Sequence, residues 1–292
     1  MPMVYVLFSA LCSVAVSVIL KLARRYSVDS RQLIVWNYPV ATGLTWLLLD
    51  PVFTNLRPDA LPWSLYLALA LLLPGIFLAI AVSIHYTGIV RTEIAQRLSL
   101  SIALLAAFWL FGETVDRGKL AGIGLGFVAI ACCIGWHKGS RRGGPRGDTV
   151  KTWVYPLVVF FGMGIIDVFF KQVAQHREIP YTTSMLLVFA LATLVSLGYL
   201  VYHTTAGKRR FSVAAIFWGL LLGIFNFGNI LLYMRAHRAL PENPSIVFSA
   251  MNIGVIALGA LVGVFVFNEK LSLLNKIGMA LAIVAVLVIA YL

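Results

Sequence analysis

Two pairs of ionisable residues lie at helical spacing inside or beside long apolar runs. Asp167 is followed four residues later by Lys171, and Glu93 is followed at the same spacing by Arg97. Residues at i and i+4 share one face of a helix, so each pair sets a carboxylate beside a cation. A charge inside hydrocarbon costs at least about 2.5–3.5 kcal/mol at a helix centre, so it faces a partner or a cavity.

Two interpretations stay open for each pair. Asp167 marks either a proton or substrate site, or a local ion pair in which Lys171 reaches the membrane interface. Glu93 and Arg97 form either a cytoplasmic-side gate or a clamp for a carboxylate, or else the solvated start of a helix. If protons are coupled to transport, Asp167 is the first candidate to carry them and Glu93 is the second.

Polar residues elsewhere in the apolar runs pose a similar choice. His85 ends one run, where it either relays protons near neutral pH or is simply a polar helix end. Ser9, Ser13, Ser17 and Lys21 recur every four residues and form a polar stripe. In lipid this stripe turns inward, where it lines a pathway or hydrogen-bonds a neighbouring helix.

Asparagines within the runs need hydrogen-bond partners as well, because hydrocarbon offers none. We expect them to line a cavity or to bond a neighbouring helix. Trp36, Asn37 and Tyr38, early in another run, indicate instead an interfacial aromatic belt. The predicted substrate-binding residues are Ser13, Ser17, His85, Arg97, Asp167, Asn226, Asn229 and Asn252.

Several kinds of chemistry are not supported by the sequence. The cysteines, Cys12, Cys132 and Cys133, lie inside apolar runs and form neither a disulfide framework nor a CxxC metal pair. The sequence contains no GxSxG, HExxH or Walker motif. We therefore expect no enzyme activity, no metal, no cofactor and no ATP-driven transport by this chain.

Composition places the chain in a membrane. Of the 292 residues, 61% are hydrophobic and 12% are charged, whereas a soluble domain carries about 25% charged residues. The net charge of +12 could suggest nucleic acid. The basic residues gather in short segments between apolar runs, however, so we expect membrane lipid rather than nucleic acid as a partner.

Ten apolar runs predict ten membrane-spanning helices, since a span needs about 20 mostly apolar residues. The fourth and sixth runs have only 15 residues, and they reach spanning length only if Arg97 and Asp167 lie inside the helix. The runs are 1–20, 32–49, 60–84, 98–112, 120–136, 152–166, 181–202, 211–234, 243–268 and 277–292.

An internal repeat joins these runs into two halves. Val18-Ile-Leu-Lys21 aligns with Val168-Phe-Phe-Lys171 at an offset of 150, and Phe111-x-Glu113 aligns with Phe267-x-Glu269 at an offset of 156. LLLPGIF ending at Phe77 resembles LLLGIF ending at Phe225. The three matches follow one order at a nearly constant offset, which predicts a duplicated unit.

The predicted domains are a first five-helix repeat at 1–137, a basic Gly-, Pro- and Arg-rich linker at 138–151, and a second five-helix repeat at 152–292. Because each half holds an odd number of spans, the second half enters the membrane inverted. Inverted repeats are typical of secondary transporters.

Two motifs carry a family resemblance. Phe111-Gly-Glu113 and Phe267-Asn-Glu269, each followed by an apolar helix, resemble the ends of two EamA repeats. The segment VSVILKLARRYSVDSRQLIVWNYPVA resembles the first two helices of such a repeat. The chain is thus similar to the ten-helix EamA-type transporters of the drug/metabolite transporter superfamily. The resemblance implies alternating access, with a central cavity lined by the first, third, fourth, sixth, eighth and ninth helices.

These observations together predict an all-α integral membrane protein of ten transmembrane helices in two inverted five-helix repeats. Its expected function is secondary transport of a small organic metabolite, amino acid-like or drug-like, across the bacterial inner membrane. We expect a small-molecule substrate and a monomer or homodimer. The alternatives are an intramembrane enzyme using His85 or Asp167 and a non-transporting membrane subunit.

Orientation follows from the basic residues, because loops rich in Lys and Arg stay in the cytoplasm. Sixteen of the 23 Lys and Arg residues belong to the odd-numbered connections between the ten runs. We therefore predict that both termini lie outside the cytoplasm and that alkaline phosphatase fused to the C-terminus is active. A C-terminal reporter that is active only in the cytoplasm would refute this topology.

Overall fold

A computed structural model gives the architecture of the chain. It describes residues 2–53, 61–99, 101–102, 105–106, 109, 117–134, 149–175, 179–205, 212–239 and 244–291. Within these ranges the chain forms helices and turns and no strand. The predicted all-α class is confirmed.

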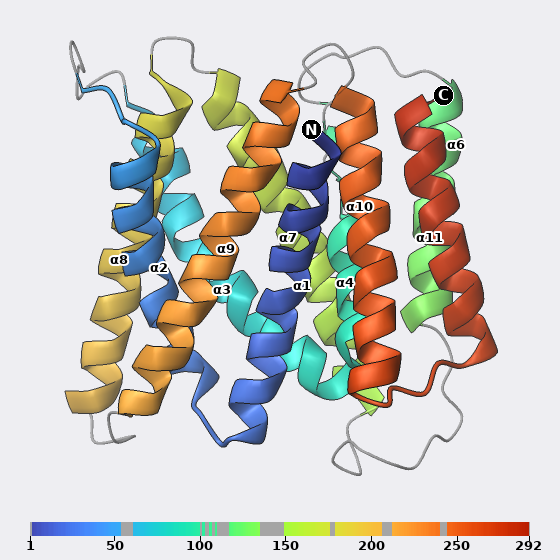
Figure 1. Cartoon of the computed structure of the whole chain (residues 1–292), viewed down its shortest axis with the longest axis horizontal. Coiled ribbons are helices and arrows are strands. Elements are labelled where there is room, and N and C mark those ends of the chain that lie inside the picture. The colour runs from blue at the N-terminus through green and yellow to red at the C-terminus, as the bar shows by residue number, and fades with distance from the viewer. Residues whose placement is uncertain are drawn as a thin grey trace. The chain divides into compact units, whose positions relative to one another are not determined.

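Ten α-helices follow one another in these ranges, and a π-helical turn, η2 (Val262–Val266), extends the one before the last (Figure 1). The α-helices are α1 (Pro2–Arg25), α2 (Ser30–Leu48), α3 (Trp63–Thr87), α4 (Ile89–Leu98), α6 (Arg117–Ile134), α7 (Thr149–Gln175), α8 (Tyr181–Thr205), α9 (Val213–Ala239), α10 (Pro244–Leu261) and α11 (Leu273–Tyr291).

The apolar composition of these helices fits a multi-pass membrane protein. In the described residues, five helices are long and apolar enough to cross a bilayer, namely α1, α3, α7, α8 and α9. Shorter apolar segments lie in α6, in α10 with η2, and in α11. Prolines inside α2, α3 and α7 leave those helices continuous. Membrane helices tolerate proline because neighbouring groups satisfy the freed carbonyls.

Two helices begin earlier than their apolar runs. α4 contains Arg97 but ends at Leu98, the first residue of the fourth run, and the structure describes only part of the rest of that run. Arg91 and Arg97 therefore belong to α4 rather than to a connection. α7 starts at Thr149, so the last residues of the predicted linker are helical, while residues 138–148 lie outside the described part of the chain.

The chain falls into two compact units, each of which draws on both halves of the sequence. Unit 1 comprises Met1–Val18, Ala79–Ile165 and Asn229–Leu292, and unit 2 comprises Ile19–Leu78 and Ile166–Gly228. Unit 1 contains all of α4, α6, α10 and α11, and unit 2 contains all of α2 and α8. The assignment of the two repeats to 1–137 and 152–292 stays a prediction.

In unit 2, the second helices of the two halves run in opposite directions. The hydroxyls of Thr42 on α2 and Thr193 on α8 lie 3.0 Å apart. Further along the chain, Thr183 Oγ1 donates to the carbonyl of Val52 at 2.8 Å. The residue number rises from Thr42 to Val52 as it falls from Thr193 to Thr183, so α2 and α8 are antiparallel.

In unit 1, the fourth helices of the two halves show the same inversion. α10 packs against α4 with Gly259 facing Glu93 and Gly263 facing Val90. The residue number rises along α10 as it falls along α4, so this pair is antiparallel too. Both pairs of helices run in the directions that an inverted second half requires, and the inversion of the two repeats stays a prediction.

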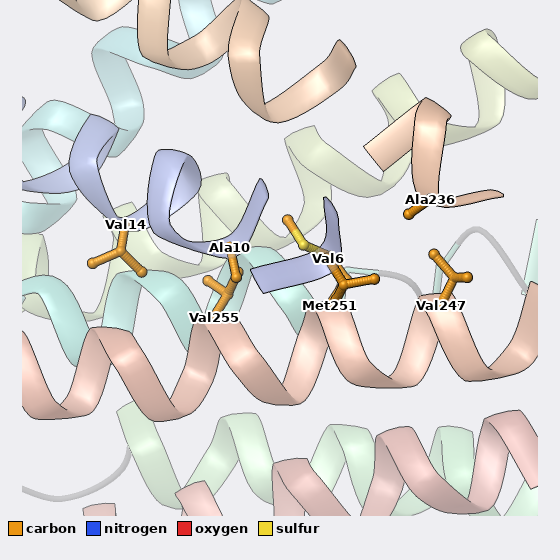
Figure 2. Close-up of a cluster of buried hydrophobic side chains, with 7 residues drawn as sticks. All are labelled: Val6, Ala10, Val14, Ala236, Val247, Met251 and Val255. Carbon is orange, nitrogen blue, oxygen red and sulfur yellow. The ribbon is translucent and has the colours of Figure 1, made fainter. Parts of the chain in front are cut away.

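A buried apolar cluster joins α1 to α10 in unit 1. Every one of its side chains is almost fully inaccessible, and Figure 2 shows α1 lying along α10 with Ala236 of α9 beside them. The members are Val6, Ala10, Val14, Ala236, Val247, Met251 and Val255. Tight packing of this kind fixes the height of α1, which carries the serine stripe.

The GxxxG spacings mark close helix approaches, as small residues at this interval do in membranes. In unit 2, Gly219 faces the backbone of Leu33, and Gly223 faces Val40 and the carbonyl of Asn37. In unit 1, Gly259 and Gly263 face α4 in the same way. At all four positions the missing side chain lets the two helices approach closely.

Gly223→Ala should destabilise the protein. The new Cβ would lie 2.6 Å from Val40 Cβ and 3.0 Å from the Asn37 carbonyl oxygen. The helices must then separate, at an expected loss of about 1–3 kcal/mol. The measurement is thermal unfolding in detergent. Gly198→Ala on α8 is the control, because nothing lies within 4 Å of its Cβ. Equal effects of the two substitutions would contradict this account of the packing.

Candidate functional site: a buried polar cluster on α1, α4 and α9

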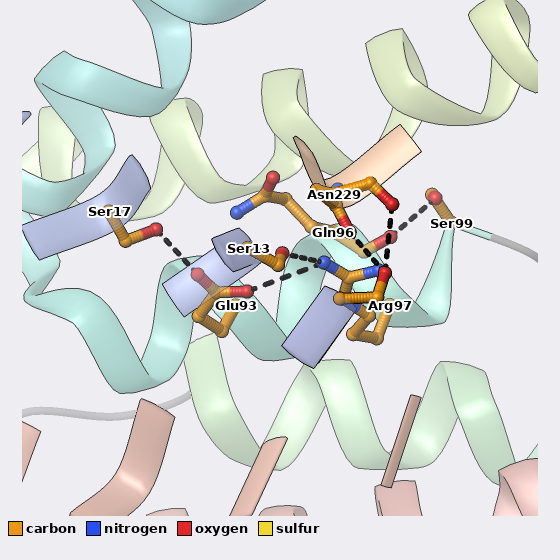
Figure 3. A network of polar contacts seen from close by, with 8 residues as sticks. Ser13, Ser17, Glu93, Gln96, Arg97, Ser99 and Asn229 are labelled. Carbon is orange, nitrogen blue, oxygen red and sulfur yellow. Dashed lines mark hydrogen bonds and ion pairs between the residues drawn. The ribbon is translucent and has the colours of Figure 1, made fainter. Parts of the chain in front are cut away.

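A carboxylate and a guanidinium on α4 meet the serine stripe of α1 inside unit 1. Ser17 Oγ donates to Glu93 Oε1 at 2.5 Å, and Arg97 Nη2 donates to Ser13 Oγ at 2.6 Å (Figure 3). Ser13 and Ser17 are four residues apart, as are Glu93 and Arg97. Because a spacing of four keeps residues on one helix face, two antiparallel helices match both pairs at once.

α4 is buried on nearly all sides. Its inaccessible residues include Ile89, Val90, Thr92 and Ile94, and Glu93 is only 1% exposed. The interpretation of Glu93 and Arg97 as the solvated start of a helix is therefore wrong. α4 begins one turn before Glu93, so Glu93 lies within the buried helix and not at its start. The apolar run, which begins at residue 98, did not indicate this.

The ion pair of Glu93 and Arg97 is incompletely bonded. Arg97 Nη2 lies 3.8 Å from Glu93 Oε2, which is too long for a hydrogen bond. Within the described residues, both Glu93 Oε2 and Arg97 Nε are buried and accept or donate no hydrogen bond. One acceptor and one donor of opposite charge thus remain unsatisfied in the same cluster.

The ends of the cluster are held by α9 and by the end of α4. Ser9 Oγ lies 2.8 Å from Asn229 Oδ1 and 2.9 Å from the Asn229 carbonyl oxygen, either of which accepts its proton. Ser99 Oγ donates to the Gln96 carbonyl at 2.6 Å (Figure 3). The serine stripe therefore bonds α4 and α9, one of the two roles expected of it.

Glu269 contributes a second carboxylate to unit 1. The sequence suggests that it stabilises the start of the helix following it, as a carboxylate at a helix N-terminus does. Its oxygens instead accept the backbone N–H groups of Ile89 and Val90, at 2.7 and 3.3 Å. Glu269 therefore caps α4, a structural role at a helix from a distant part of the chain. Its repeat partner Glu113 lies outside the described residues.

The remaining predicted site residues divide between the units. His85 lies half-buried in the last turn of α3, with its ring edge-on to Tyr86, and Asn252 is buried in α10. Both belong to unit 1. Asp167 and Asn226 belong to unit 2.

In unit 2, Asn226 Nδ2 donates to Asn37 Oδ1 at 3.2 Å. Asn37 and Tyr38 are fully buried, so their assignment to an interfacial belt is wrong. Asn37 is a polar residue that the sequence could have marked, since its amide inside an apolar run needs a partner. Asp167 is half-buried in α7. Both interpretations of Asp167 stay open.

In the described ranges, no three His, Cys, Asp or Glu side chains gather in a way that could hold a metal ion. The chemistry that the cluster offers is therefore hydrogen bonding and charge. It presents a carboxylate oxygen, a guanidinium nitrogen and serine hydroxyls from antiparallel helices.

Comparisons with known proteins agree with this architecture. A model of the EamA-like transporter family matches residues 1–135. An uncharacterized protein of Haemophilus influenzae is 38% identical over 291 residues, which cover 98% of this chain and 97% of that protein. A protein of known crystal structure shares the fold, with a TM-score of 0.56 and 14% identity over 97% of this chain and 95% of its own.

A double-mutant cycle tests the coupling of Glu93 and Arg97. Arg97→Gln leaves a carboxylate buried without its cation, a change that costs about 3–5 kcal/mol in buried pairs. Glu93→Gln combined with Arg97→Gln removes both charges, so we expect the double variant to be more stable than Arg97→Gln alone. The measurement is unfolding of the purified protein in mixed micelles. Simple additivity of the two losses would contradict coupling.

Proposed function

Because this chain belongs to the EamA-like transporter family, we propose that it is a secondary transporter that carries a small organic solute across the bacterial inner membrane by alternating access. A family of transporters also fits the expectation that the chain is not an enzyme. The observation that carries the proposal to a site is the buried, incompletely bonded pair of Glu93 and Arg97.

The inverted repeat supports the mechanism. Two halves of opposite orientation can exchange conformations. In one state the protein then opens to one side of the membrane, and after the exchange it opens to the other side. Two pairs of equivalent helices, α2 with α8 in unit 2 and α4 with α10 in unit 1, are antiparallel and so support this mechanism. Transport through such an arrangement needs a polar site within the helices rather than at their ends.

The unsatisfied atoms favour one class of solute. Arg97 Nε can donate to an anionic oxygen, and a bond between guanidinium and carboxylate is among the stronger hydrogen bonds in proteins. Glu93 Oε2 can accept from an ammonium group. A zwitterion with both groups on one carbon atom, as in an α-amino acid, satisfies both positions together.

A cationic drug-like solute fits the site less well. It would satisfy Glu93 and leave Arg97 Nε buried without an acceptor, and an unsatisfied charged group is costly in an apolar interior. Ser13 and Ser17 already bond the other atoms of the pair, so they orient Arg97 and Glu93 for the solute. We therefore propose the amino acid-like class of solute over the drug-like one.

Proton coupling belongs to the same proposal. Asp167 and Glu93 are the two carboxylates that we assign as candidates for carrying a coupled proton. A neutral amide at the coupling position should remove uptake driven by a pH gradient. Counterflow exchange needs no net proton movement, so a coupling variant whose binding site is intact should retain it.

Counterflow in proteoliposomes tests the transport proposal. Labelled L-amino acids are screened first, and the best substrate is then compared with its deaminated acid and its decarboxylated amine. Each analogue loses one charge-assisted hydrogen bond, worth about 1.5–3 kcal/mol, so we expect at least about tenfold weaker competition. Arg97→Gln should abolish exchange, whereas Arg235→Gln at an exposed position of α9 should retain it.

One result would contradict transport, and another would contradict the assignment of the site. Absence of counterflow for all amino acids and for a broad solute panel would favour a non-transporting membrane subunit. If Arg97→Gln exchanges solute as fast as the wild-type protein does, the buried cluster does not bind the substrate, although the protein still transports it. Asp167→Asn and Glu93→Gln are measured in parallel, with and without a pH gradient.

A further inference from the structure

We propose that Glu269 is a positioning residue for the buried cluster, because its carboxylate fixes the start of α4 to the end of α10 throughout the transport cycle. We call this contact between the start of α4 and the end of α10 the joint. Its effect on transport rests on the proposed function, but the joint itself is a property of unit 1. Glu269 acts through the backbone of α4 and does not bind the solute.

The carboxylate supplies a cap that α4 lacks. The N-cap residue of α4 is Gly88, which has no side chain to accept the first N–H groups. The donors of Ile89 and Val90 are bonded by Glu269 Oε1 and Oε2, from a residue 180 positions later in the chain. The first N–H groups of a helix need such acceptors, and the helix dipole favours a negative charge there.

The backbone of Glu269 is tied to the end of α10. Its N–H donates to the Gly263 carbonyl at 2.9 Å, and the Phe267 N–H donates to the Val262 carbonyl at 3.2 Å. Between them, Asn268 turns the chain with φ +52°, a left-handed conformation that asparagine tolerates better than most residues. One residue thus closes η2 with its backbone and caps α4 with its side chain.

Glycines leave room for this joint. Gly88 has φ +87°, and a Cβ on it would lie 2.6 Å from the Glu269 carboxyl carbon. A Cβ on Gly263 would lie 2.6 Å from Val90 Cγ2 and 3.0 Å from Glu269 Oε2. The two helix ends therefore approach as closely as they do only because both positions are glycine.

The joint sets the position of the charged pair. Glu93 lies one turn after Ile89 on the same short helix, and Arg97 lies one turn further. A shift of α4 by one residue would rotate its side chains by about 100° and move them about 1.5 Å along the axis. Either displacement would separate Glu93 from Ser17 and Arg97 from Ser13.

Amide hydrogen exchange tests the cap without any transported solute. In nanodiscs, Glu269→Ala should speed the exchange of the Ile89 and Val90 amides at least tenfold, and Glu269→Gln should have a smaller effect because its amide oxygen still accepts one bond. Asp29→Ala is the control: Asp29 accepts the Arg31 N–H at the start of α2, so only α2 amides should respond. Unchanged exchange at Ile89 and Val90 in Glu269→Ala would overturn the inference and leave the proposed function standing.

Counterflow then tests the positioning role. We expect Glu269→Ala to raise the KM of the best amino acid at least fivefold with a smaller change in kcat, and Glu269→Gln to recover part of the affinity. A fall in kcat alone at an unchanged KM would contradict positioning of the binding site. Absence of counterflow in the wild-type protein would defeat the proposed function, whereas the exchange experiment would still report on the joint.

A cross-link tests whether the joint stays closed. Val90→Cys with Gly263→Cys, in a chain whose native cysteines are replaced by alanine, places two thiols at the contact between α4 and η2. The first substitution removes the Val90 Cγ2 that would lie 2.6 Å from the new Cβ at position 263, so only the Glu269 carboxylate, 3.0 Å away, has to shift. Oxidation should leave at least half of the counterflow measured for the same protein in reduced form. Loss of counterflow on oxidation that is restored by reduction would show that the joint opens, and would overturn the proposal that α4 and α10 move together.

Discussion

Burying a carboxylate in an apolar helix bundle constrains everything around it, because the charge has to be balanced and its oxygens bonded. Glu93 meets this demand with Ser17 on one oxygen and with the nearby guanidinium of Arg97 on the other side. Arg97 in turn bonds Ser13. Ser13 and Ser17, which share the four-residue spacing of Glu93 and Arg97, thus bond both members of the pair across the contact between α1 and α4. Within the part of the chain that the structure describes, Glu93 Oε2 and Arg97 Nε keep no hydrogen-bond partner, and a site for a charged solute requires such atoms.

The scaffold around the pair is nearly symmetric, whereas its chemistry is not. α4 and α10 are equivalent helices of the two halves, and they oppose each other in unit 1 through Gly259 and Gly263. α4 contributes the charged residues to this contact, and α10 contributes the glycines that let it approach them. Of two helices that the predicted repeat makes equivalent, one thus holds the charge and the other makes room for it.

Several parts of this arrangement followed from residue types and spacing. The helical class and the pairing of Glu93 with Arg97 depend on local periodicity, which the chain displays directly. The predictions failed where a residue's burial or hydrogen-bond partner depends on a segment far away in the sequence. Asn37 and Tyr38 were assigned to the interface because aromatic and polar residues near a helix end usually lie there. Both are fully buried instead, since Asn37 bonds Asn226 of α9 and the ring of Tyr38 lies edge-on to Phe77 of α3. Glu269 was paired with the wrong helix for the same reason, since its partner N–H groups lie 180 residues away.

The sequence by itself determined the solvent of this protein, its helical class and its duplicated, inverted construction, because hydrophobic content and period are properties of single segments. Only the tertiary structure decided which polar atoms meet. Hydrogen bonds such as those from Ser17 to Glu93 and from Ile89 to Glu269 depend on the relative height of packed helices. Helix height is set by close packing across many residues, and no local pattern in the chain records it.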